Sequence, residues 1–447
     1  MLPGRPRVLR DPIHGDIAFP RNKFGELLEA IFDTQAYQRL RGIRQNGVMN
    51  LVFHGAEHSR FAHSIGVAHI AGAMFDASVS NSQVKYSENE REETILAALL
   101  HDVGHGPFSH TLEEIIKATE RSQFDHETMT ERFISEPGSE IYRILSQYRP
   151  DLPSRLVPYI NKKKRTQSQW FYAIVSSQLD ADRIDYLMRD SRMSGVNHLF
   201  DSKRLIQFLG VFNGEMVLDR RASDVVESFL LAIDQMYSSA YFHKTVRAAS
   251  VLLSNVIRRA VDLAASDKAM QDSLFPVLSG SNNQLWAVFE KGDQAPLSLY
   301  DNLDEHLVWT LILRWRGVSD RTLSDLTQRL LTRNFFKAIT LDKLPTTKRM
   351  KAHSLAQELV KRKIPDVDPK YYLDIDEPER VSYKRFTLGE GPSASIKLLD
   401  DDNKVRPVEE LPRSIARIIA EKMYFPRLIV PEEVRDEVEA WVRKESK

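Results

Sequence analysis

Apolar residues recur at three- and four-residue steps over much of this chain, which is the spacing of one face of an α-helix. The pattern is clearest over residues 92–100, 171–189 and 225–256, and few segments there alternate in the manner of a strand. Helix-breaking clusters such as Gly104-His105-Gly106-Pro107 separate the runs. From a short helix over residues 24–32 to about residue 260, the sequence therefore predicts a helical body.

The pattern changes after about residue 260. The remaining segments are read as polar loops over 265–300, helix over 301–338, a charged and Pro-interrupted stretch over 345–380, strands over 381–388 and 393–399, an Asp-rich turn over 400–403, helix over 412–422, strand over 425–430, and helix over 431–444. We therefore predict a mainly α fold with a helical core over residues 1–260, a helical extension over 261–340, and a smaller mixed α+β C-terminal lobe over 341–447.

The composition excludes several classes of site and partner. None of the 447 residues is Cys, so disulfides, thiolate nucleophiles, iron–sulfur clusters and Cys-based zinc sites are excluded. Any transition-metal site must use His and carboxylates. The 62 Lys+Arg balance the 62 Asp+Glu, which argues against a broadly cationic nucleic-acid surface. Since no run is long enough to cross a bilayer and the start lacks a signal peptide, we expect a cytoplasmic protein and no membrane partner.

The strongest chemical signal follows the helix that ends near residue 100. The segment reads His101-Asp102-Val103-Gly104-His105-Gly106-Pro107-Phe108-Ser109-His110. His63 opens another helix upstream, and Asp182, Tyr186 and Asp190 form one stripe of a helix downstream. In isolation that stripe would be read as a solvated face. Together, however, His63, His101, Asp102 and Asp182 provide two imidazoles and two carboxylates, which suit a divalent ion such as Mn, Fe, Zn, Ni or Mg.

These motifs resemble those of the HD-domain metal phosphohydrolases. Two further blocks, Asp11-Pro12-Ile13-His14-Gly15 and Gln38-Arg39-Leu40-Arg41, narrow the resemblance to the deoxynucleoside triphosphate (dNTP) triphosphohydrolase branch, and within it to the SAM-and-HD-domain group. The resemblance covers about residues 7–250 and includes no SAM domain. It implies an HD-domain helical core and metal-dependent hydrolysis of a dNTP to deoxynucleoside and tripolyphosphate.

The resemblance also implies a role for individual residues. The metal ligands would be His63, His101, Asp102 and Asp182. The catalytic group would be His105, His110, Glu113 and His126, with His110 protonating the leaving 5′-oxygen and Glu113 polarising it. The substrate-binding residues would be Arg60, Arg183 and Tyr186 on phosphate, Gln45 and Asp190 on the 3′-OH, and Tyr241 under the sugar.

Two positions depart from the family pattern. At the position eight residues before Tyr241, the family has an Arg that holds the triphosphate, whereas this chain has Ile233. If the helix register is the same, Lys244 or Arg247 must substitute. Asn46 also stands where the related enzymes have an apolar residue, so we expect a wetter pocket at the 3′ end.

A second set of matches predicts an activator site. Arg7, Val8, Asp33, Gln38 and Arg41 match residues that read guanine at a non-catalytic site, which implies activation by GTP, dGTP or a dNTP. A carboxylate can accept from guanine N1–H and N2–H while an Arg donates to O6 or N7. Nucleotide binding of this kind bridges subunits in the family, so we expect a homo-oligomer, either a dimer or a tetramer. The alternative is an ordinary surface network.

Two other function classes stay open at this point. The first is an HD phosphohydrolase with another substrate: a nucleotidase, a cyclic-nucleotide phosphodiesterase or a nuclease, favoured by the missing Arg at Ile233. The basic run Lys162-Lys163-Lys164-Arg165 gives a nuclease slight support, although a solvated loop is the favoured interpretation and nucleic acid is not the favoured partner. The second is a nucleotide-sensing regulatory protein with little catalysis.

Overall fold

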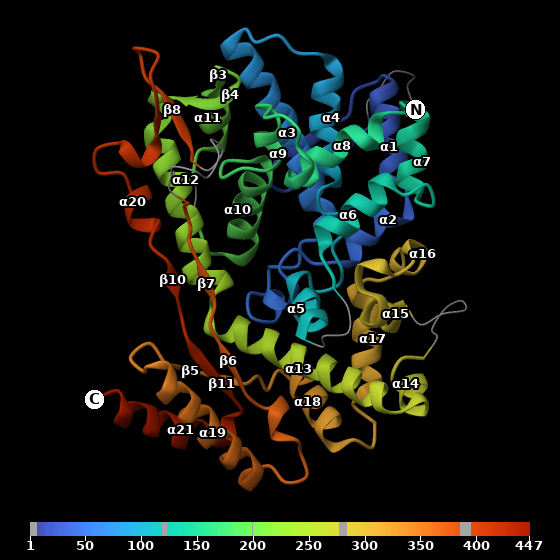
Figure 1. Cartoon of the computed structure of the whole chain (residues 1–447), viewed down its shortest axis with the longest axis vertical. Helices are drawn as coiled ribbons and strands as arrows, with labels where there is room; N and C mark the ends of the chain where they lie inside the picture. Colours follow the sequence, from blue (N-terminus) through green and yellow to red (C-terminus); the bar gives the residue numbers. More distant parts are fainter. Residues whose placement is uncertain (1–6, 119–122, 199, 277–283, 385–394) are drawn as a thin grey trace.

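The computed structural model describes residues 7–118, 123–198, 200–276, 284–384 and 395–447 (Figure 1). Helices dominate, and most begin at a side-chain cap. In chain order they are α1 (Lys23–Phe32), α2 (Gln35–Gln38), α3 (Arg60–Ser82), α4 (Glu88–Leu100), α5 (His110–Ala118), α6 (His126–Ser135), α7 (Glu140–Tyr148), α8 (Leu152–Ile160), α9 (Tyr172–Val175), α10 (Ala181–Ser194), α11 (Ser202–Gln207), α12 (Ser223–Met236), α13 (Lys244–Ser266), α14 (Lys268–Leu274), α15 (Gln284–Lys291), α16 (Leu297–Tyr300), α17 (Glu305–Trp315), α18 (Arg321–Leu331), α19 (Thr346–Lys363), α20 (Ala416–Ile419) and α21 (Glu432–Glu445).

Helices α3, α4 and α10 form the centre of the upper part in Figure 1 and carry the residues of the predicted metal site. The Ser59 side chain accepts from Ala62 N and starts α3 three residues before His63. A capping box between Ser87 and Glu90 starts α4, whose buried second half ends at His101. The Asp180 side chain accepts from Arg183 N and caps α10, so that Asp182 lies in the first turn of that helix. Each cap therefore fixes where its helix presents a site residue.

A single π-helical turn, Tyr237–Tyr241, follows α12 and precedes the start of α13 at Lys244. A π-turn contains one more residue per hydrogen-bonded loop than an α-turn and often occurs at functional sites. It changes the register between Ile233 and Tyr241, so that counting residues along an α-helix does not tell which side chains share a face. Ile233, on α12, is only 1% exposed and packs into the hydrophobic core of the protein.

The strands of the described residues form four small sheets. Strands β1 (Val8–Asp11) and β2 (Gly15–Ala18) pair as an antiparallel hairpin, and β3 (Leu209–Phe212) pairs with β4 (Glu215–Asp219) across Asn213-Gly214. Strand β8 (Lys397–Leu399) pairs parallel with β4 and antiparallel with β9 (Val405–Pro407). The lower sheet has the order β5–β11–β6, from β5 (Lys337–Thr340), β11 (Arg427–Val430) and β6 (Asp374–Asp376). Strand β7 (Glu379–Arg380) pairs with β10 (Met423–Tyr424).

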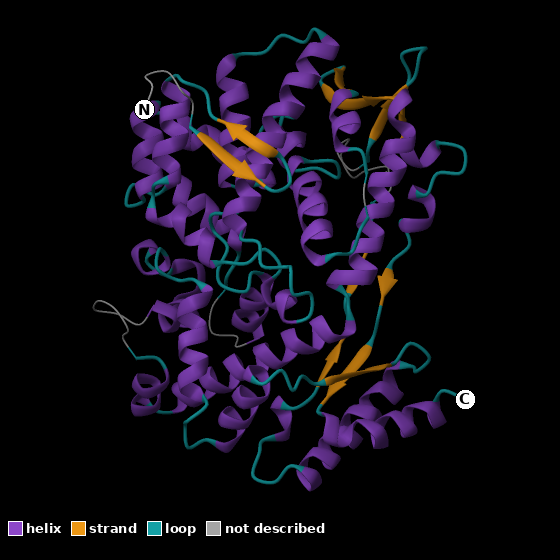
Figure 2. Ribbon diagram, turned by 180° about the vertical axis from the view of Figure 1, so that it is seen from behind, coloured by secondary structure: helices purple, strands orange, loops and turns teal. Residues whose placement is uncertain are grey.

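Figure 2 shows the C-terminal region as a small mixed structure, in which α19 and α21 pack on the lower sheet while β8 and β9 extend the upper one. The predicted fold class, a helical HD-type core with a smaller mixed C-terminal lobe, is confirmed. The boundaries at residues 260 and 340 stay a prediction. Contacts cross them, since α13 continues through residue 260 and β8 joins the sheet of β3 and β4.

Several local predictions differ from the structure. Residues 412–422 contain only the short helix α20. The described parts of the predicted loop region, residues 265–276 and 284–300, contain the end of α13 and helices α14, α15 and α16, while residues 277–283 lie outside the described residues. Residues 381–384 are not a strand, and the rest of that predicted strand, 385–388, lies outside the described residues, as do residues 393–394 of the next. The end of the predicted helix over 301–338 enters β5, because Arg333 takes a left-handed φ of 59° after α18. Within the described residues, no helix is both long enough and apolar enough to cross a membrane.

Candidate active site

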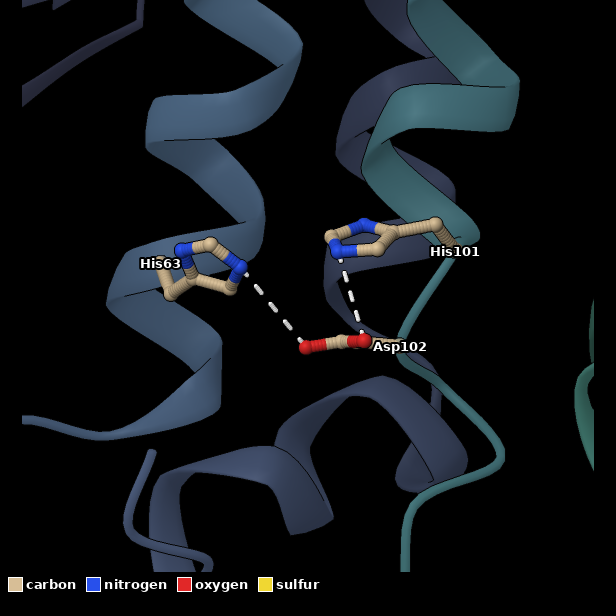
Figure 3. Close-up of side chains that lie close together, drawn as sticks. All are labelled: His63, His101 and Asp102. Carbon is tan, nitrogen blue, oxygen red and sulfur yellow. Dashed lines mark ion pairs between the residues drawn. The ribbon is translucent and has the colours of Figure 1, made fainter. Parts of the chain in front are cut away.

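The four predicted metal ligands lie together where three helix ends meet. His63 Nε2 lies 3.7 Å from Asp102 Oδ2 and 3.1 Å from Asp182 Oδ1. His101 Nε2 lies 3.2 Å from Asp102 Oδ1 and 3.7 Å from Asp182 Oδ1. Figure 3 shows His63 on α3 and His101 at the end of α4, both directed at Asp102. The sequence order of these residues thus becomes one cluster in space.

The donor set of this cluster fits a divalent cation. The Nε2 atoms of His63 and His101 are buried and have no hydrogen-bond partner among the described residues. Burying such atoms without a partner is costly, so their shared direction indicates a ligand that they bind. Burial would lower the pKa of His63, but the neighbouring carboxylates of Asp182 and Asp185 raise it to about 10. A metal ion would meet that same negative potential.

Asp185 holds His63 from behind. His63 Nδ1 donates to Asp185 Oδ2 over 2.8 Å, which leaves Nε2 directed at the cluster. Asp185 also accepts from His14 Nε2 over 2.6 Å and from Arg189 Nε and Nη2 over 2.9 Å each. Arg189 Nη1 donates to Asp11 Oδ2 over 2.9 Å. A carboxylate behind a ligating His fixes its tautomer and ring orientation, so this network holds His63 in the orientation that a metal ligand would need.

Gly66 makes room for that network. A Cβ atom at residue 66 would lie 1.9 Å from Asp185 Oδ1 and 2.6 Å from Arg189 Nη2. No side chain fits at either distance. The position on α3 one turn after His63 therefore requires glycine.

The turn that follows His101 and Asp102 is pinned by Arg39. This buried side chain donates to Val103 O over 2.6 Å and to His105 O over 2.8 Å. Phe108 and Ser109 then take left-handed φ values of 59° and 54°. Consecutive non-glycine residues in this region carry strain that the surroundings must hold, and such strain clusters at functional sites.

A second imidazole group adjoins the first cluster. His126 Nδ1 donates to Glu113 Oε1 over 2.6 Å, and the His105 and His126 rings stack at 3.9 Å. His110 Nδ1 lies 3.4 Å from Glu113 Oε2 on a side chain that is 67% exposed. Burial opposes charge on His126, yet Glu113 raises its pKa, whereas burial and Arg60 hold the pKa of His105 well below its usual range. Neighbouring imidazoles therefore favour opposite protonation states.

A cavity of 480 Å³ opens beside both groups, and every predicted substrate-binding residue lines it: Gln45, Arg60, Arg183, Tyr186, Asp190 and Tyr241. Among the described residues, its walls contain buried polar atoms without partners, namely Gln45 Oε1, Asn46 Nδ2, Tyr186 OH and Arg380 Nε. Buried polar groups are ordinarily satisfied, so this concentration indicates a pocket for a polar ligand.

Several lining side chains are held by neighbours. Asp190 accepts from His58 Nε2 over 2.7 Å and from Tyr241 OH over 2.6 Å. Arg60 pairs with Asp102 and donates from Nε to Ser109 Oγ over 3.0 Å. Arg183 Nε donates to Ser177 O over 3.1 Å.

Neither expected substitute for the missing Arg faces this cavity. Arg247 Nη2 forms an ion pair with Asp376 over 2.5 Å, and Lys244 lines a different cavity near α21. The cations that do line the active-site cavity besides Arg60 and Arg183 are Lys162 and Arg380. Lys162 belongs to the run interpreted as a solvated loop, and Arg380 comes from β7.

The predicted activator residues lie close together on the surface. Arg7 Nη2 lies 3.5 Å from Asp33 Oδ1, and Arg41 Nε donates to Gln38 Oε1 over 2.8 Å. The Arg41 guanidinium covers the Phe61 ring at 3.5 Å, and Val8, 45% exposed, stands on β1. Both an activator site and a surface network agree with these contacts.

Sequence reasoning missed the residues that support the site. His14 and His58 were given no role, and Asp185, Arg189 and Arg380 were not singled out. Asp185 had a signal, because it stands three residues after Asp182 and therefore beside it on α10. Arg380 had none, since only the path of the C-terminal chain brings it to the pocket.

The fold and the His–His–Asp–Asp cluster define an HD-type metal hydrolase. Residues 60–156 match the HD domain model, and residues 200–275 match the HD associated region. A phosphohydrolase structure from Bacteroides thetaiotaomicron has a TM-score of 0.78 at 25% identity, over 96% of this chain and 100% of that chain.

Two curated relatives are similar to this chain over most of its length. Uncharacterized protein YwfO of Bacillus subtilis is 31% identical over 95% of this chain and 93% of its own length. The deoxynucleoside triphosphate triphosphohydrolase SAMHD1 homolog of Dictyostelium discoideum is 30% identical over 70% of this chain and 63% of its own length. The chain belongs to the HD-domain phosphohydrolase family, in the group related to the SAMHD1 proteins, which confirms the resemblance found in its motifs.

Proposed function

We propose that this protein hydrolyses deoxynucleoside triphosphates to deoxynucleoside and tripolyphosphate. The observation that carries the proposal is the convergence of His63, His101, Asp102 and Asp182 beside a cavity lined by guanidinium groups. The name of the SAMHD1 homolog supports the substrate class. When bound by these four residues, a divalent ion would activate water and stabilise charge on phosphate oxygens.

Arg60 and Arg183 bind the phosphate oxygens in this proposal, together with Tyr186. Arg60 is 4% exposed, so its guanidinium acts where little water screens it. The Tyr186 hydroxyl has no partner among the described residues and is free to donate to a phosphate oxygen. Because a guanidinium offers paired donors in a rigid plane, it suits phosphate better than an ammonium does.

Proton transfer falls to the second imidazole group. Hydrolysis at the α-phosphorus breaks the bond to the 5′-oxygen, which must gain a proton. His110 was predicted to supply it with Glu113 behind it. Glu113 lies 2.6 Å from His126 Nδ1 but 3.4 Å from His110 Nδ1, and it raises the pKa of His126. Both observations favour His126 as the protonated imidazole. His105, whose pKa is held low, is neutral and can position a water.

The sugar occupies the end of the cavity formed by Gln45, Asp190 and Tyr241 in this proposal. Since Asp190 already accepts from His58 and Tyr241, its remaining lone pairs accept from a 3′-OH while its position is fixed. The unpartnered Asn46 Nδ2 adds a donor at this end.

The test is product analysis by HPLC of the four dNTPs with Mn, with and without GTP. We expect deoxynucleoside and tripolyphosphate, and loss of both products in His101→Ala and Asp102→Ala. Nucleoside monophosphate and pyrophosphate as products would favour another HD phosphohydrolase reaction. Nucleotide that binds tightly and remains intact would favour a sensing protein. A panel of dNMP, cyclic dinucleotides and single-stranded DNA separates the remaining substrates.

Activation through the Arg7, Val8, Asp33, Gln38 and Arg41 group is a second part of the proposal. The Asp33 carboxylate, 68% exposed, and the Arg41 guanidinium would read a guanine edge. In Asp33→Asn we expect GTP to lose its effect on turnover and on the oligomer measured by light scattering, while the site at His101 stays intact. Equal GTP response in wild type and variant would leave the group as a surface network.

A further inference from the structure

The C-terminal region contributes one cation to the active-site cavity. Arg380 ends β7, whose pairing with β10 places it beside the end of α12 (Figure 1). Its guanidinium covers the Tyr237 ring at 3.8 Å, and its Nε atom is buried without a hydrogen-bond partner among the described residues. A donor held in this way by an aromatic ring and left unsatisfied is available to an acceptor from the cavity.

A second cavity of 560 Å³ continues outward from the first. The two share the lining residues Lys162, Ser176, Ser177, Arg183 and Arg380. The outer cavity is strongly basic, because six cationic side chains face a single carboxylate, that of Glu379. The cations are Lys162, Arg165, Arg183, Arg380, Lys384 and Lys422.

Part of this positive charge has no carboxylate partner. Lys422 pairs with Glu379, and Arg165 donates to the carbonyls of Pro158 and Tyr159. Within the described ranges, no ion pair engages Lys162, Lys384 or Arg380. Surface cations are ordinarily interspersed with acids, so an uncompensated group beside a catalytic cavity indicates an anionic ligand.

The backbone of this outer cavity is held in place. The Gln178 side chain donates through Nε2 to Lys384 O and accepts at Oε1 from Lys384 N, both over 2.7 Å. This double contact ties the segment after β7 to the loop before α10. The cations of the C-terminal chain are thereby held at the edge of the catalytic core.

We propose that the outer cavity is a polyphosphate subsite in which Arg380 clamps the outer phosphates of the chain that leaves the active-site cavity. Arg380 thus takes the place of the arginine that Ile233 replaces, and it comes from the C-terminal chain beside Tyr237. The proposal rests on the proposed function for the identity of the substrate, but binding of a polyphosphate chain does not require turnover. It makes Arg380 a determinant of triphosphate over monophosphate specificity.

The test measures binding and turnover separately in Arg380→Gln. Binding of inorganic tripolyphosphate to protein in excess EDTA is followed by calorimetry, so neither metal nor catalysis contributes. A charged hydrogen-bonding side chain of this kind changes affinity by about tenfold to a hundredfold. We expect that loss in Arg380→Gln, a smaller one in Lys384→Ala, and none in Arg362→Ala, a surface arginine of α19 paired with Glu437.

Kinetics give the second readout. If dNTP is turned over, Arg380→Gln should raise KM for dNTP by a similar factor and leave the Kd for dNMP unchanged. Wild-type affinity for tripolyphosphate and wild-type KM in this variant would overturn the subsite while leaving the proposed function intact. Loss of tripolyphosphate binding in a protein that turns over no dNTP would refute the proposed function and support the subsite. If circular dichroism shows that Arg380→Gln folds poorly, Arg380→Lys replaces it, because lysine keeps the charge but lacks the paired donors of the guanidinium. We expect Arg380→Lys to bind tripolyphosphate with intermediate affinity. Full affinity in both Arg380→Lys and Lys384→Ala would overturn the proposal.

Discussion

Replacing Gly66 with alanine should disable the proposed metal site without changing any of its proposed ligands. The new Cβ would stand 1.9 Å from Asp185 Oδ1, whereas ordinary contact begins at 3.4 Å. The carboxylate must therefore retreat by about 1.5 Å, which is large compared with the width of a van der Waals minimum. Because Asp185 accepts from His14, His63 and Arg189 together, it cannot move without breaking charged hydrogen bonds.

The magnitude follows from three terms. Alanine in place of glycine inside a helix stabilises by about 0.5–1 kcal/mol. Overpacking a filled interior costs about 1–3 kcal/mol, and separating members of a buried ion pair costs about 3–5 kcal/mol. Together these terms predict a net loss of about 3–7.5 kcal/mol in stability. Loss of the carboxylate behind His63 should weaken metal binding by about 10–100-fold.

The assay is a paired measurement of melting temperature and Mn affinity, the latter by competition with a chelator. Gly72→Ala is the matched control, because it lies on the same helix and its Cβ would meet only Ile95 Cδ1 at 3.4 Å. We expect that control to keep its metal affinity and to gain up to about 1 kcal/mol. Equal metal affinity and stability in the two variants would show that Asp185 neither needs its present position nor orients His63.

Three further outcomes follow from the site. Since Glu113 raises the pKa of His126, the stabilisation from that pair is complete below the ordinary His pKa and is lost as pH rises through the raised pKa. Turnover should fall over the same pH interval, and Glu113→Gln should move the alkaline limb of the kcat–pH profile to lower pH. An alkaline limb that does not move would exclude His126 as the proton donor. Adding Mn at about 100 times its Kd should raise stability by about 2.7 kcal/mol in thermal unfolding, and a similar gain in Asp182→Asn would contradict its assignment as a ligand. Tyr241→Phe removes a donor to Asp190 and should weaken deoxynucleotide binding several-fold in KM, while unchanged KM would place the sugar elsewhere.

The parts of the fold that the sequence predicts well are those encoded locally. The helix that ends at His101 is preceded by a Ser-x-x-Glu cap and contains an apolar face, so both its ends could be read from the chain. The hairpin of β3 and β4 lies inside the region predicted as a helical body and was missed, although Asn213-Gly214 is a local turn signal whose φ values of 51° and 77° this pair of residues tolerates. The helix predicted over residues 412–422 depended on spacing alone, and packing retains only α20.

The candidate site also contains some residues that local sequence predicts and others that only tertiary contacts place. His63, His101, Asp102 and Asp182 could be proposed because metal ligation restricts residue type and order. The hydrogen bonds of Asp185 depend on how closely α10 approaches α3 at Gly66, which no spacing within one helix reveals. Arg380 is separated from His101 by more than half of the chain, and its position depends on long-range contacts, namely the pairing of β7 with β10 and the tie between Gln178 and Lys384.

The pairing of β7 with β10, a ladder of only two residue pairs, has a thermodynamic consequence. Strands this short contribute few interstrand hydrogen bonds, so β7 and β10 belong among the elements expected to open locally well before the helical core. A ligand that bridges Arg380 and the core favours only the closed form, so occupancy of the cavity must suppress opening of the ladder in proportion to that binding energy. Amide hydrogen exchange at Met423 and Tyr424, remote from the reacting phosphorus, would thus report on occupancy of the active site.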